Sequence, residues 1–413
     1  MSAPASPDTP AGAAAVLRST QAVRSRARVL LERARAGRSQ YFEVNDQAMT
    51  RAATLTAEIT RRRYPSLKIP YHSRWRHFEA GGIQRAVQLD ALLGSTDPHG
   101  RARAQIDLAV VSVLLDAGAG ASWHYLEPGT GLRLGRSEGL GVASFHAFTR
   151  GLFSSDPRHP LQADAEGLRA LTASALATAF QVTEHNTLVG LEGRVTLLQK
   201  LGAALAAQPH WFGTAGRPGG LFDSVPRPGP DTLHAHDLLA TLLDTLSAIW
   251  AAPNAIANLP LGDCWPHPDV TGEGLTHGWM PFHKLSQWLT YSLLEPFEWA
   301  GVAVNGLDSL TGLPEYRNGG LFLDSGVLQP RAVEAASRTW SVADPFIVEW
   351  RALTVALLDE LAPRVRSALG VAEHDLPLAC VLEGGTWAAG RALAQELRAG
   401  LPPLQIESDG TVF

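Results

Sequence analysis

Residues 344–365 read DPFIVEWRALTVALLDELAPRV, and this stretch decides the fold class. Asp344 and Pro345 are typical of a helix start, because Asp is a preferred N-cap residue and Pro is tolerated in the first turn. The apolar side chains that follow recur at the spacing of one helix face: Ile347, Trp350, Leu357, Leu358, Leu361 and Val365. The pattern therefore predicts a long amphipathic helix in this part of the chain.

The same helical period recurs in three other segments of the chain. These are residues 104–115, 195–205 and 237–250. Strand signals are limited to two short apolar segments, 378–382 and 404–407. The sequence shows neither a sustained alternation of strands and helices nor an internal repeat. It therefore predicts a mainly helical fold with a few short strands.

The domain organisation is expected to be simple. Residues 1–14 are rich in Ala, Pro, Ser and Thr and are predicted to form a disordered tail. Residues 15–413 are expected to form a single helical catalytic unit. The Gly/Pro-rich segment 213–230 marks a possible internal division, either as a linker or as an ordered loop over a site. The apolar GGLFD sequence at 219–223 favours the ordered loop.

Composition and charge exclude several classes of partner. The net charge is −5 and no long run of basic residues occurs, which argues against nucleic-acid binding. No apolar stretch reaches the roughly 18 residues that span a bilayer, and the N-terminus lacks a secretory pattern. Cys264 and Cys380 lie far apart without CxxC spacing, as expected in a reducing compartment. We expect a cytoplasmic protein that binds a small molecule and neither nucleic acid nor membrane.

The residue types that carry chemistry gather in 277–324, beginning with a predicted helix over residues 281–295. His283, Gln287, Tyr291 and Glu295 are four residues apart and would share one face of this helix, with Lys284 beside it. Lysine occurs at three positions in the whole chain, so its presence in this cluster stands out. A solvated helix face explains the pattern equally well.

A second cluster reads LPEYRNGG at 313–320 and is followed by Asp324. Glu315, Tyr316, Arg317 and Asn318 place a carboxylate, a phenol, a guanidinium and a carboxamide within four residues. Such a set is suited to a phosphorylated sugar, since Arg binds an anion and the acidic and amide groups bind hydroxyls. The ordinary alternative is a Glu–Arg pair that fixes a loop.

A third segment, LEGGTWAAGR at 382–391, has weaker signals. A short strand, a turn at Gly384 and Gly385, and a helix start would direct backbone N–H groups at an anion, with Arg391 nearby. The segment matches neither phosphate-loop motif, and a plain strand–helix turn is the commoner structure. The histidines lack metal-ligand spacing and no GxSxG elbow occurs, so we expect no metal and no cofactor.

Several long blocks of the sequence resemble the uracil-catabolism family of fungi and bacteria, long described as a domain of unknown function. The blocks are PFHKLSQWLTYSLLEP (281–296), LTGLPEYRNGGLFLDSGVL (310–328), EWRALTVALLDEL (349–361), LEGGTWAAGR (382–391) and PPLQIESDGTVF (402–413). The likeness covers nearly the whole chain after the first few dozen residues. It implies a pathway that ribosylates uracil, opens the ring and releases urea, so that one step must cleave a bond between ribose and a urea nitrogen.

Two shorter blocks also resemble the queuosine-nucleotide salvage hydrolases, which are helical proteins related to DNA glycosylases that cleave an N-glycosidic bond. These blocks are FHKLSQWL (282–289) and LTGLPEYRNGG (310–320). The matching positions are Phe282, Lys284, Gln287, Glu315, Tyr316 and Arg317. This chain departs from that pattern by having Glu315 where those hydrolases have Asp, which moves the carboxylate by about one bond length.

Together the resemblances imply an N-ribosyl hydrolase that acts on a 5′-phosphorylated ribosylurea-type intermediate. Cleavage develops positive charge on the sugar, which a carboxylate stabilises or attacks. Glu315 is the first candidate for this carboxylate and Asp324 the second. Lys284 is expected to keep the carboxylate ionised, because a nearby cation lowers its pKa.

The remaining candidates are assigned to substrate binding. Arg317, Arg391 and the Gly384–Gly385 turn would hold the phosphate, Trp288 or Tyr316 would pack on the ribose or ureido group, and Asn318, Asp409, His283 and Gln287 would supply polar contacts. Two alternatives stay open. One is an amidohydrolase that attacks the ureido carbonyl, and the other is a pathway scaffold with a large exposed apolar patch.

Overall fold

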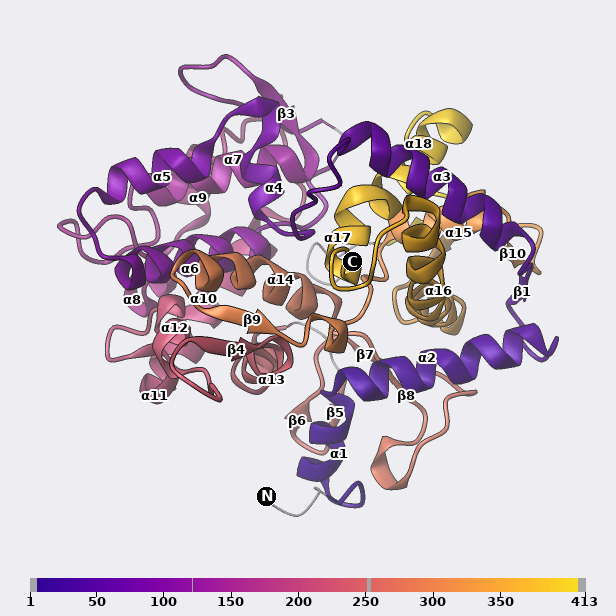
Figure 1. Ribbon diagram of the computed structural model, residues 1–413. Coiled ribbons are helices and arrows are strands. Elements are labelled where there is room, and N and C mark those ends of the chain that lie inside the picture. The colour runs from indigo at the N-terminus through magenta and orange to yellow at the C-terminus, as the bar shows by residue number, and fades with distance from the viewer. Residues whose placement is uncertain (1–5, 121, 251–253, 408–413) are drawn as a thin grey trace. The chain divides into compact units, whose positions relative to one another are not determined.

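The computed structural model describes residues 6–120, 122–250 and 254–407, which form two compact units (Figure 1). The first unit contains residues 6–72, 254–287 and 306–407, and the second contains the described residues between 73 and 250 together with 288–305. The chain passes from one unit to the other within helix α14 (Lys284–Trp299). The Gly/Pro-rich segment lies wholly inside the second unit, so the units do not divide there.

The first unit is built from helices joined by irregular segments. Its helices are α1 (Pro10–Leu17), α2 (Thr20–Arg35), α3 (Ala48–Arg63), α15 (Tyr316–Asp324), α16 (Pro345–Leu369), α17 (Leu378–Val381) and α18 (Trp387–Arg398), with short 3₁₀ turns η4 (Gly274–Thr276) and η5 (Leu307–Ser309). A π-helical turn, η6 (Leu382–Thr386), joins α17 to α18. Helices thus make up most of this unit, as the sequence predicts.

The strands of the first unit form two-stranded ladders only, as far as the structure describes the chain. Antiparallel pairs join β1 (Phe42–Val44) to β10 (Leu328–Pro330), β5 (Ala255–Ile256) to β6 (Leu259–Pro260), and β7 (Cys264–Pro266) to β8 (Trp279–Pro281). A parallel pair joins β11 (Thr339–Trp340) to β12 (Gln405–Ile406). The predicted strand at 404–407 is therefore confirmed in β12.

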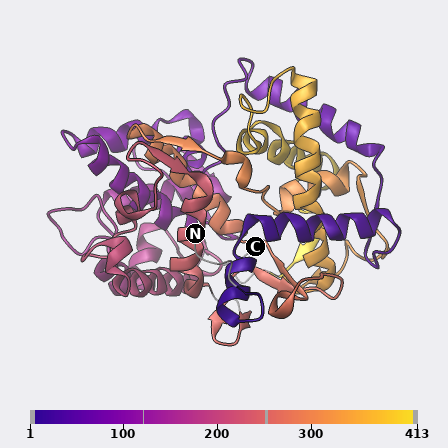
Figure 2. The same ribbon diagram turned by 60° about the horizontal axis from the view of Figure 1, so that its bottom comes forward.

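Helix α16 lies at the centre of the first unit, where α2 crosses it and α3 packs beside it (Figure 2). Its predicted N-cap is confirmed, because the Asp344 carboxylate accepts the N–H of Phe346 at 3.0 Å. The predicted apolar face is also confirmed, since every one of its six side chains is buried. Phe346 adds stacked contacts to Trp340 at 4.2 Å and to Phe42 at 4.7 Å between ring centroids.

The N-terminal segment corrects one expectation. The sequence predicts a disordered tail over residues 1–14, but residues 10–14 form the first part of α1. Thr9 caps this helix and Pro10 occupies its first turn. Ala13, Ala14 and Leu17 are buried in a small cluster with Leu261 and Cys264. An Ala-rich composition suits both a disordered chain and a helix, and here the buried cluster selects the helix.

The second unit is also helical. Its helices are α4 (Trp75–Phe78), α5 (Arg85–Leu93), α6 (Pro98–Leu114), α7 (Arg136–Thr149), α8 (Ala165–Ala170), α9 (Ala173–Ala179), α10 (Leu191–Ala206), α11 (Pro209–Phe212), α12 (Leu221–Ser224) and α13 (Ala235–Leu246), with short turns η1 (Ala80–Gly82), η2 (Pro218–Gly220) and η3 (Ser247–Ile249). β2 (His124–Leu126) pairs with β3 (Arg133–Gly135), and β4 (Thr232–His234) pairs with β9 (Ala303–Asn305). The three predicted helices correspond to α6, α10 and α13.

The Gly/Pro-rich segment of the second unit is ordered by one buried carboxylate. Asp107, on α6, accepts two hydrogen bonds from Arg217 at 2.9 and 2.7 Å and the N–H of Gly219 at 2.7 Å. Leu221 and Phe222 are buried beside it. The segment is therefore packed against α6 rather than serving as a linker. Within the described residues, no helix combines the length and apolarity needed to cross a membrane.

The predicted strand at 378–382 is wrong. Residues 378–381 form helix α17, and residues 382–386 form the π-helical turn that leads into α18. A short buried apolar run fits a strand and a buried helix equally well. Gly384 and Gly385 do not form a strand–helix turn. Instead, α3 packs against them, and a Cβ on Gly385 would lie 2.4 Å from the hydroxyl oxygen of Thr60.

Gly390 lies where α15 packs closely on α18, and this position has no room for a side chain. A Cβ at this position would lie 2.0 Å from the carbonyl oxygen of Arg317, so the two helices would have to separate. We expect Gly390→Ala to lower the free energy of unfolding by about 1–3 kcal/mol. Urea unfolding followed by circular dichroism measures this change.

Gly320 offers a matched control on α15 itself. A Cβ there would meet Pro403 at 3.4 Å, which is ordinary van der Waals contact. Because Ala favours a helix more than Gly does, Gly320→Ala is expected to be neutral or to stabilise by up to about 1 kcal/mol. Equal stability of the two variants would contradict the packing argument.

Candidate functional site

Lys284 stands at the start of α14, three residues later than the predicted helix start. Pro281 still belongs to β8, and His283 has a left-handed backbone with φ of 50°. The main chain here is held by Asp263, whose carbonyl accepts the N–H groups of Phe282 and His283. The Asp263 carboxylate accepts the N–H of Lys284 at 3.0 Å. Asp263 therefore fixes the main chain where α14 begins, and with it the position of Lys284.

A buried arginine holds Asp263 in turn. Arg351, on α16, donates two hydrogen bonds to the two carboxylate oxygens at 2.8 and 2.7 Å. Trp265 adds a third at 2.7 Å. Burial alone would raise the pKa of Asp263, but the charge and hydrogen bonds of Arg351 hold it at about 2. The start of α14 is thus anchored to the centre of the first unit by an ionised pair.

Gln287 connects α14 to the segment that carries Glu315. Its side-chain oxygen accepts the N–H of Thr311 at 2.8 Å, and its side-chain nitrogen donates to the hydroxyl of Thr311. The same nitrogen donates to the carbonyl of Phe282 at 3.2 Å. Gln287 therefore links the start of α14 to the 310–328 block, and its predicted contact with substrate stays a prediction.

Glu315 is the N-cap of α15 and is partly buried. Its carboxylate accepts the N–H of Arg317 at 2.7 Å and the N–H of Asn318 at 2.5 Å. Burial raises the pKa of Glu315, while these two N–H groups and the positive charges of Lys284 and His72 act in the opposite direction. Lys284 thus acts on Glu315 in the predicted sense, but burial outweighs its effect.

His72 belongs to this site, although nothing in the sequence drew attention to it. Its Nδ1 lies 2.9 Å from a carboxylate oxygen of Glu383, in the π-helical turn. The other oxygen of Glu383 accepts hydrogen bonds from Arg63 at 2.8 Å and from the hydroxyl of Tyr64 at 2.9 Å. Burial would raise the pKa of Glu383, but these partners hold it at about 2. His72 and Glu383 are 311 residues apart in the chain, which hides the pair from any local motif.

The side chains next to Glu315 have structural partners. Arg317 is buried and donates to the carbonyl of Gly400 with both terminal nitrogens at 3.3 Å, and its guanidinium lies 4.7 Å from the ring centre of Tyr316. Asn318 is buried and donates to the carbonyl of Leu313 at 3.0 Å. Arg317 therefore ties α15 to the segment after α18, and phosphate binding by it stays a prediction.

The remaining described candidates lie on three different helices. Asp324 is at the opposite end of α15, about 13 Å along the helix, and pairs with Arg398 at 2.6 Å. Arg391 is exposed on α18, 5.4 Å from the ring centre of Trp387. Trp288 belongs to the second unit. Asp409 lies outside the described residues.

The predicted polar face of α14 is buried rather than solvated. His283 lies in the first unit, where its Nε2 is 2.9 Å from the carbonyl of Leu17, and burial lowers its pKa. Tyr291 and Glu295 lie in the second unit and are also buried. Burial raises the pKa of Glu295 to about 7, even though Arg76 donates to it at 2.7 Å. Gln287, Tyr291 and Glu295 thus share a face of α14, whereas His283 precedes the helix, and the chain passes into the second unit after Gln287.

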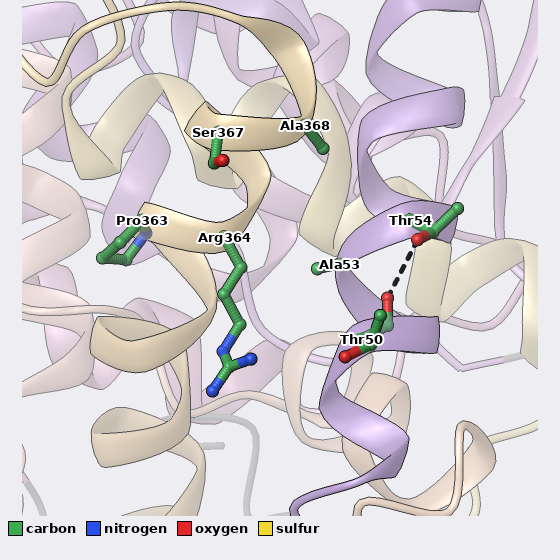
Figure 3. A pocket seen from close by; sticks show the side chains of 7 residues that line it. All are labelled: Thr50, Ala53, Thr54, Pro363, Arg364, Ser367 and Ala368. Atoms are coloured by element: carbon green, nitrogen blue, oxygen red, sulfur yellow. Dashed lines mark hydrogen bonds between the residues drawn. The ribbon is translucent and has the colours of Figure 1, made fainter.

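An open hollow of about 390 Å³ lies elsewhere in the first unit, between α3 and α16 (Figure 3). It is lined by Thr50, Ala53, Thr54, Pro363, Arg364, Ser367 and Ala368. None of the predicted site residues lines it. Among the described residues, no three His, Cys, Asp or Glu side chains gather as metal ligands would. The charged side chains that act on Glu315 are Lys284 and His72.

Comparison with known proteins places these residues in a family. A family model described as a protein of unknown function (DUF1688) matches residues 16–413. The protein named Protein urg3 of Schizosaccharomyces pombe is 38% identical over 409 residues, covering 97% of this chain and 98% of that protein. Uracil catabolism protein 4 of Lachancea kluyveri is 37% identical over 411 residues, covering 91% and 93%. The match spans the Lys284 and Glu315 blocks together with His72 and Glu383, and the chain belongs to the DUF1688 family.

Proposed function

We propose that this protein takes part in uracil catabolism as an N-ribosyl hydrolase, which cleaves the ribose–nitrogen bond of a phosphorylated ribosylurea-type intermediate. The observation that carries the proposal is the carboxylate of Glu315, which is partly buried and subject to the positive charges of Lys284 and His72. The name of the Lachancea kluyveri relative, a uracil catabolism protein, supports the pathway.

Glu315 has capacity left for a substrate after it caps α15. The two backbone N–H groups use one acceptor position on each carboxylate oxygen, and a carboxylate has about four such positions. The free positions are able to face the anomeric carbon as positive charge develops there. The capping N–H groups also orient the carboxylate, so that it needs little reorganisation during the reaction.

The direct test supplies the purified protein with ribosylurea 5-phosphate, whose ureido group carries no other substituent. The expected products are urea and ribose 5-phosphate in equal amounts. An amidohydrolase acting on the ureido carbonyl would instead release ammonia and carbon dioxide and leave a ribosylamine. The proposal would be overturned if urea were released neither from this substrate nor from its unphosphorylated form.

Lys284 gives a prediction about pH. Glu315 must be ionised to act, so kcat/KM should fall as the pH is lowered through the pKa of this carboxyl group. The positive charge of Lys284 opposes the effect of burial on that pKa. We expect Lys284→Met to raise the pKa further and therefore to move the acid limb of the kcat/KM profile to higher pH.

The control for this measurement is Lys200→Met. Lys200 is exposed on α10 in the second unit, and its substitution by Met also removes one positive charge. We expect its pH profile to match that of the unaltered protein. An acid limb that moves equally in both variants would exclude a specific effect of Lys284 on Glu315.

A further inference from the structure

The side chain of His72 has one ring nitrogen fixed and the other available. Nδ1 is bound to Glu383 at 2.9 Å, and Nε2 has no hydrogen-bond partner among the described residues. The ring lies 6.4 Å from that of Trp387, between centroids, and the main-chain N–H of His72 donates to the carbonyl of Ala379 at 3.0 Å. His72 is therefore held at its backbone and at one nitrogen.

Glu383 is itself constrained to a single orientation. Arg63 and Tyr64, at the end of α3, both donate to Oε1, which leaves Oε2 for His72. A carboxylate bound to Nδ1 keeps a proton on that nitrogen, so that Nε2 is the position where a proton is gained or lost. The arrangement matches a base or acid oriented by a third group, which recurs in enzymes that move protons.

The neighbourhood of His72 is that of Glu315. His72 contacts the first turn of α18 through Trp387, and one turn later Gly390 of α18 packs directly on the backbone of Arg317. Arg317 is two residues from Glu315, whose carboxylate is exposed to the charge of His72. The imidazole of His72 and the carboxylate of Glu315 therefore lie near the same contact between α15 and α18.

We propose that His72 is the proton carrier of this site and that Glu383 is the residue that positions it. This inference rests on the proposed N-ribosyl hydrolase function. Glu315 and Lys284 do not account for proton transfer to the leaving nitrogen, and His72 would supply it. This transfer is needed because a ureido nitrogen is a poor leaving group unless it receives a proton.

In the proposed reaction His72 first donates one proton and later takes one back. As the bond between C1 of the ribose and the ureido nitrogen breaks, its electron pair stays on nitrogen, and the Nε2 proton of imidazolium transfers to that nitrogen to give neutral urea. Glu315 stabilises the sugar cation or bonds to C1. Neutral His72 then takes a proton from water while the water oxygen bonds to C1, which releases ribose 5-phosphate and restores imidazolium.

The test compares two leaving groups in the full-length protein. One substrate is ribosylurea 5-phosphate, and the other is 4-nitrophenyl riboside 5-phosphate, whose nitrophenolate leaves without a proton. We expect His72→Asn to lower kcat/KM for ribosylurea 5-phosphate by about 10²–10⁴-fold. The loss with the nitrophenyl riboside should be tenfold or less by the same argument, whereas Glu315→Gln should impair both substrates.

Two further variants separate this role from a structural one. Glu383→Gln should show the same dependence on the leaving group in weaker form, and it serves as the second test if His72→Asn folds poorly. His146→Asn is the matched control, because His146 pairs with the buried Glu127 at 2.8 Å in the second unit. It should show no dependence on the leaving group.

The outcomes are distinguishable. Equal losses on both substrates in His72→Asn, or no loss on either, overturn the role of His72 and leave the proposed function standing. Failure of the unaltered protein to release urea overturns the proposed function and this inference together.

Discussion

Glu315→Gln is expected to lower kcat/KM for ribosylurea 5-phosphate by about 10³-fold, because the neutral amide does not stabilise the sugar cation. The amide oxygen still accepts one of the two backbone N–H groups that cap α15, so the fold should persist. Urea release measures the activity, and thermal unfolding verifies that the variant is folded. Full activity in a folded Glu315→Gln variant would rule out the carboxylate mechanism.

Glu315→Asp is the matched comparison for this prediction. Aspartate is also a good N-cap residue and keeps the negative charge, but its carboxylate lies one methylene closer to the backbone. We expect its stability to equal that of the unaltered protein and its activity to lie between those of the Glu and Gln forms. Activity as low as that of the glutamine variant would show that position matters as much as charge.

Asp263→Ala is expected to lower the free energy of unfolding by about 3–5 kcal/mol. The side chain of Arg351 is 1% exposed, so the substitution would leave a buried cation without its carboxylate. The main-chain N–H of Lys284 would also lose its acceptor. Urea unfolding followed by tryptophan fluorescence measures the loss.

Glu43→Ala provides the control for Asp263. Glu43 pairs with Arg331 at 2.7 Å in the same unit, but both side chains are substantially exposed. Surface pairs contribute about 0–1 kcal/mol, so this variant should be nearly as stable as the unaltered protein. Similar losses in the two variants would contradict the importance of burial.

Acid titration checks the same pair independently. The pKa of Asp263 is about 2 in the folded protein and ordinary in the unfolded chain. A depressed pKa means that the contribution of this carboxylate is present above the unfolded value and is lost as the pH falls toward 2. The stability of Asp263→Asn should therefore depend less on pH in that interval.

The sequence predicts the helices of this protein better than its junctions. The cap at Asp344 and the apolar face that follows are local patterns, and both are confirmed. The helix start at 281 and the strand at 378–382 are wrong, because β8 and the packing of α3 on Gly384 and Gly385 decide them. β8 forms because it pairs with β7, and α3 comes from the N-terminal part of the chain, so neither cause appears in the local pattern of apolar residues.

The sequence likewise predicts only some of the residues of the candidate site. Lys284 and Glu315 stand in blocks whose residue types attract attention, and the structure brings them within electrostatic reach. His72 and Glu383 carry no motif, and their pairing depends on contact between segments more than 300 residues apart. Asp324, the second candidate carboxylate, follows Glu315 closely in sequence, but α15 carries it to the opposite helix end.

The π-helical turn at Leu382–Thr386 has a consequence for how this family can vary in length. Such a turn holds one residue more than the α-helical turn it replaces. Deleting one residue there would restore an α-helical turn, because the wider turn takes up the extra residue within a single revolution. Gly390 would keep the side that meets α15, and only the residues inside the turn would change direction. Relatives are therefore expected to gain or lose a single residue here without turning the helix that follows, whereas Gly385 has no room for a side chain.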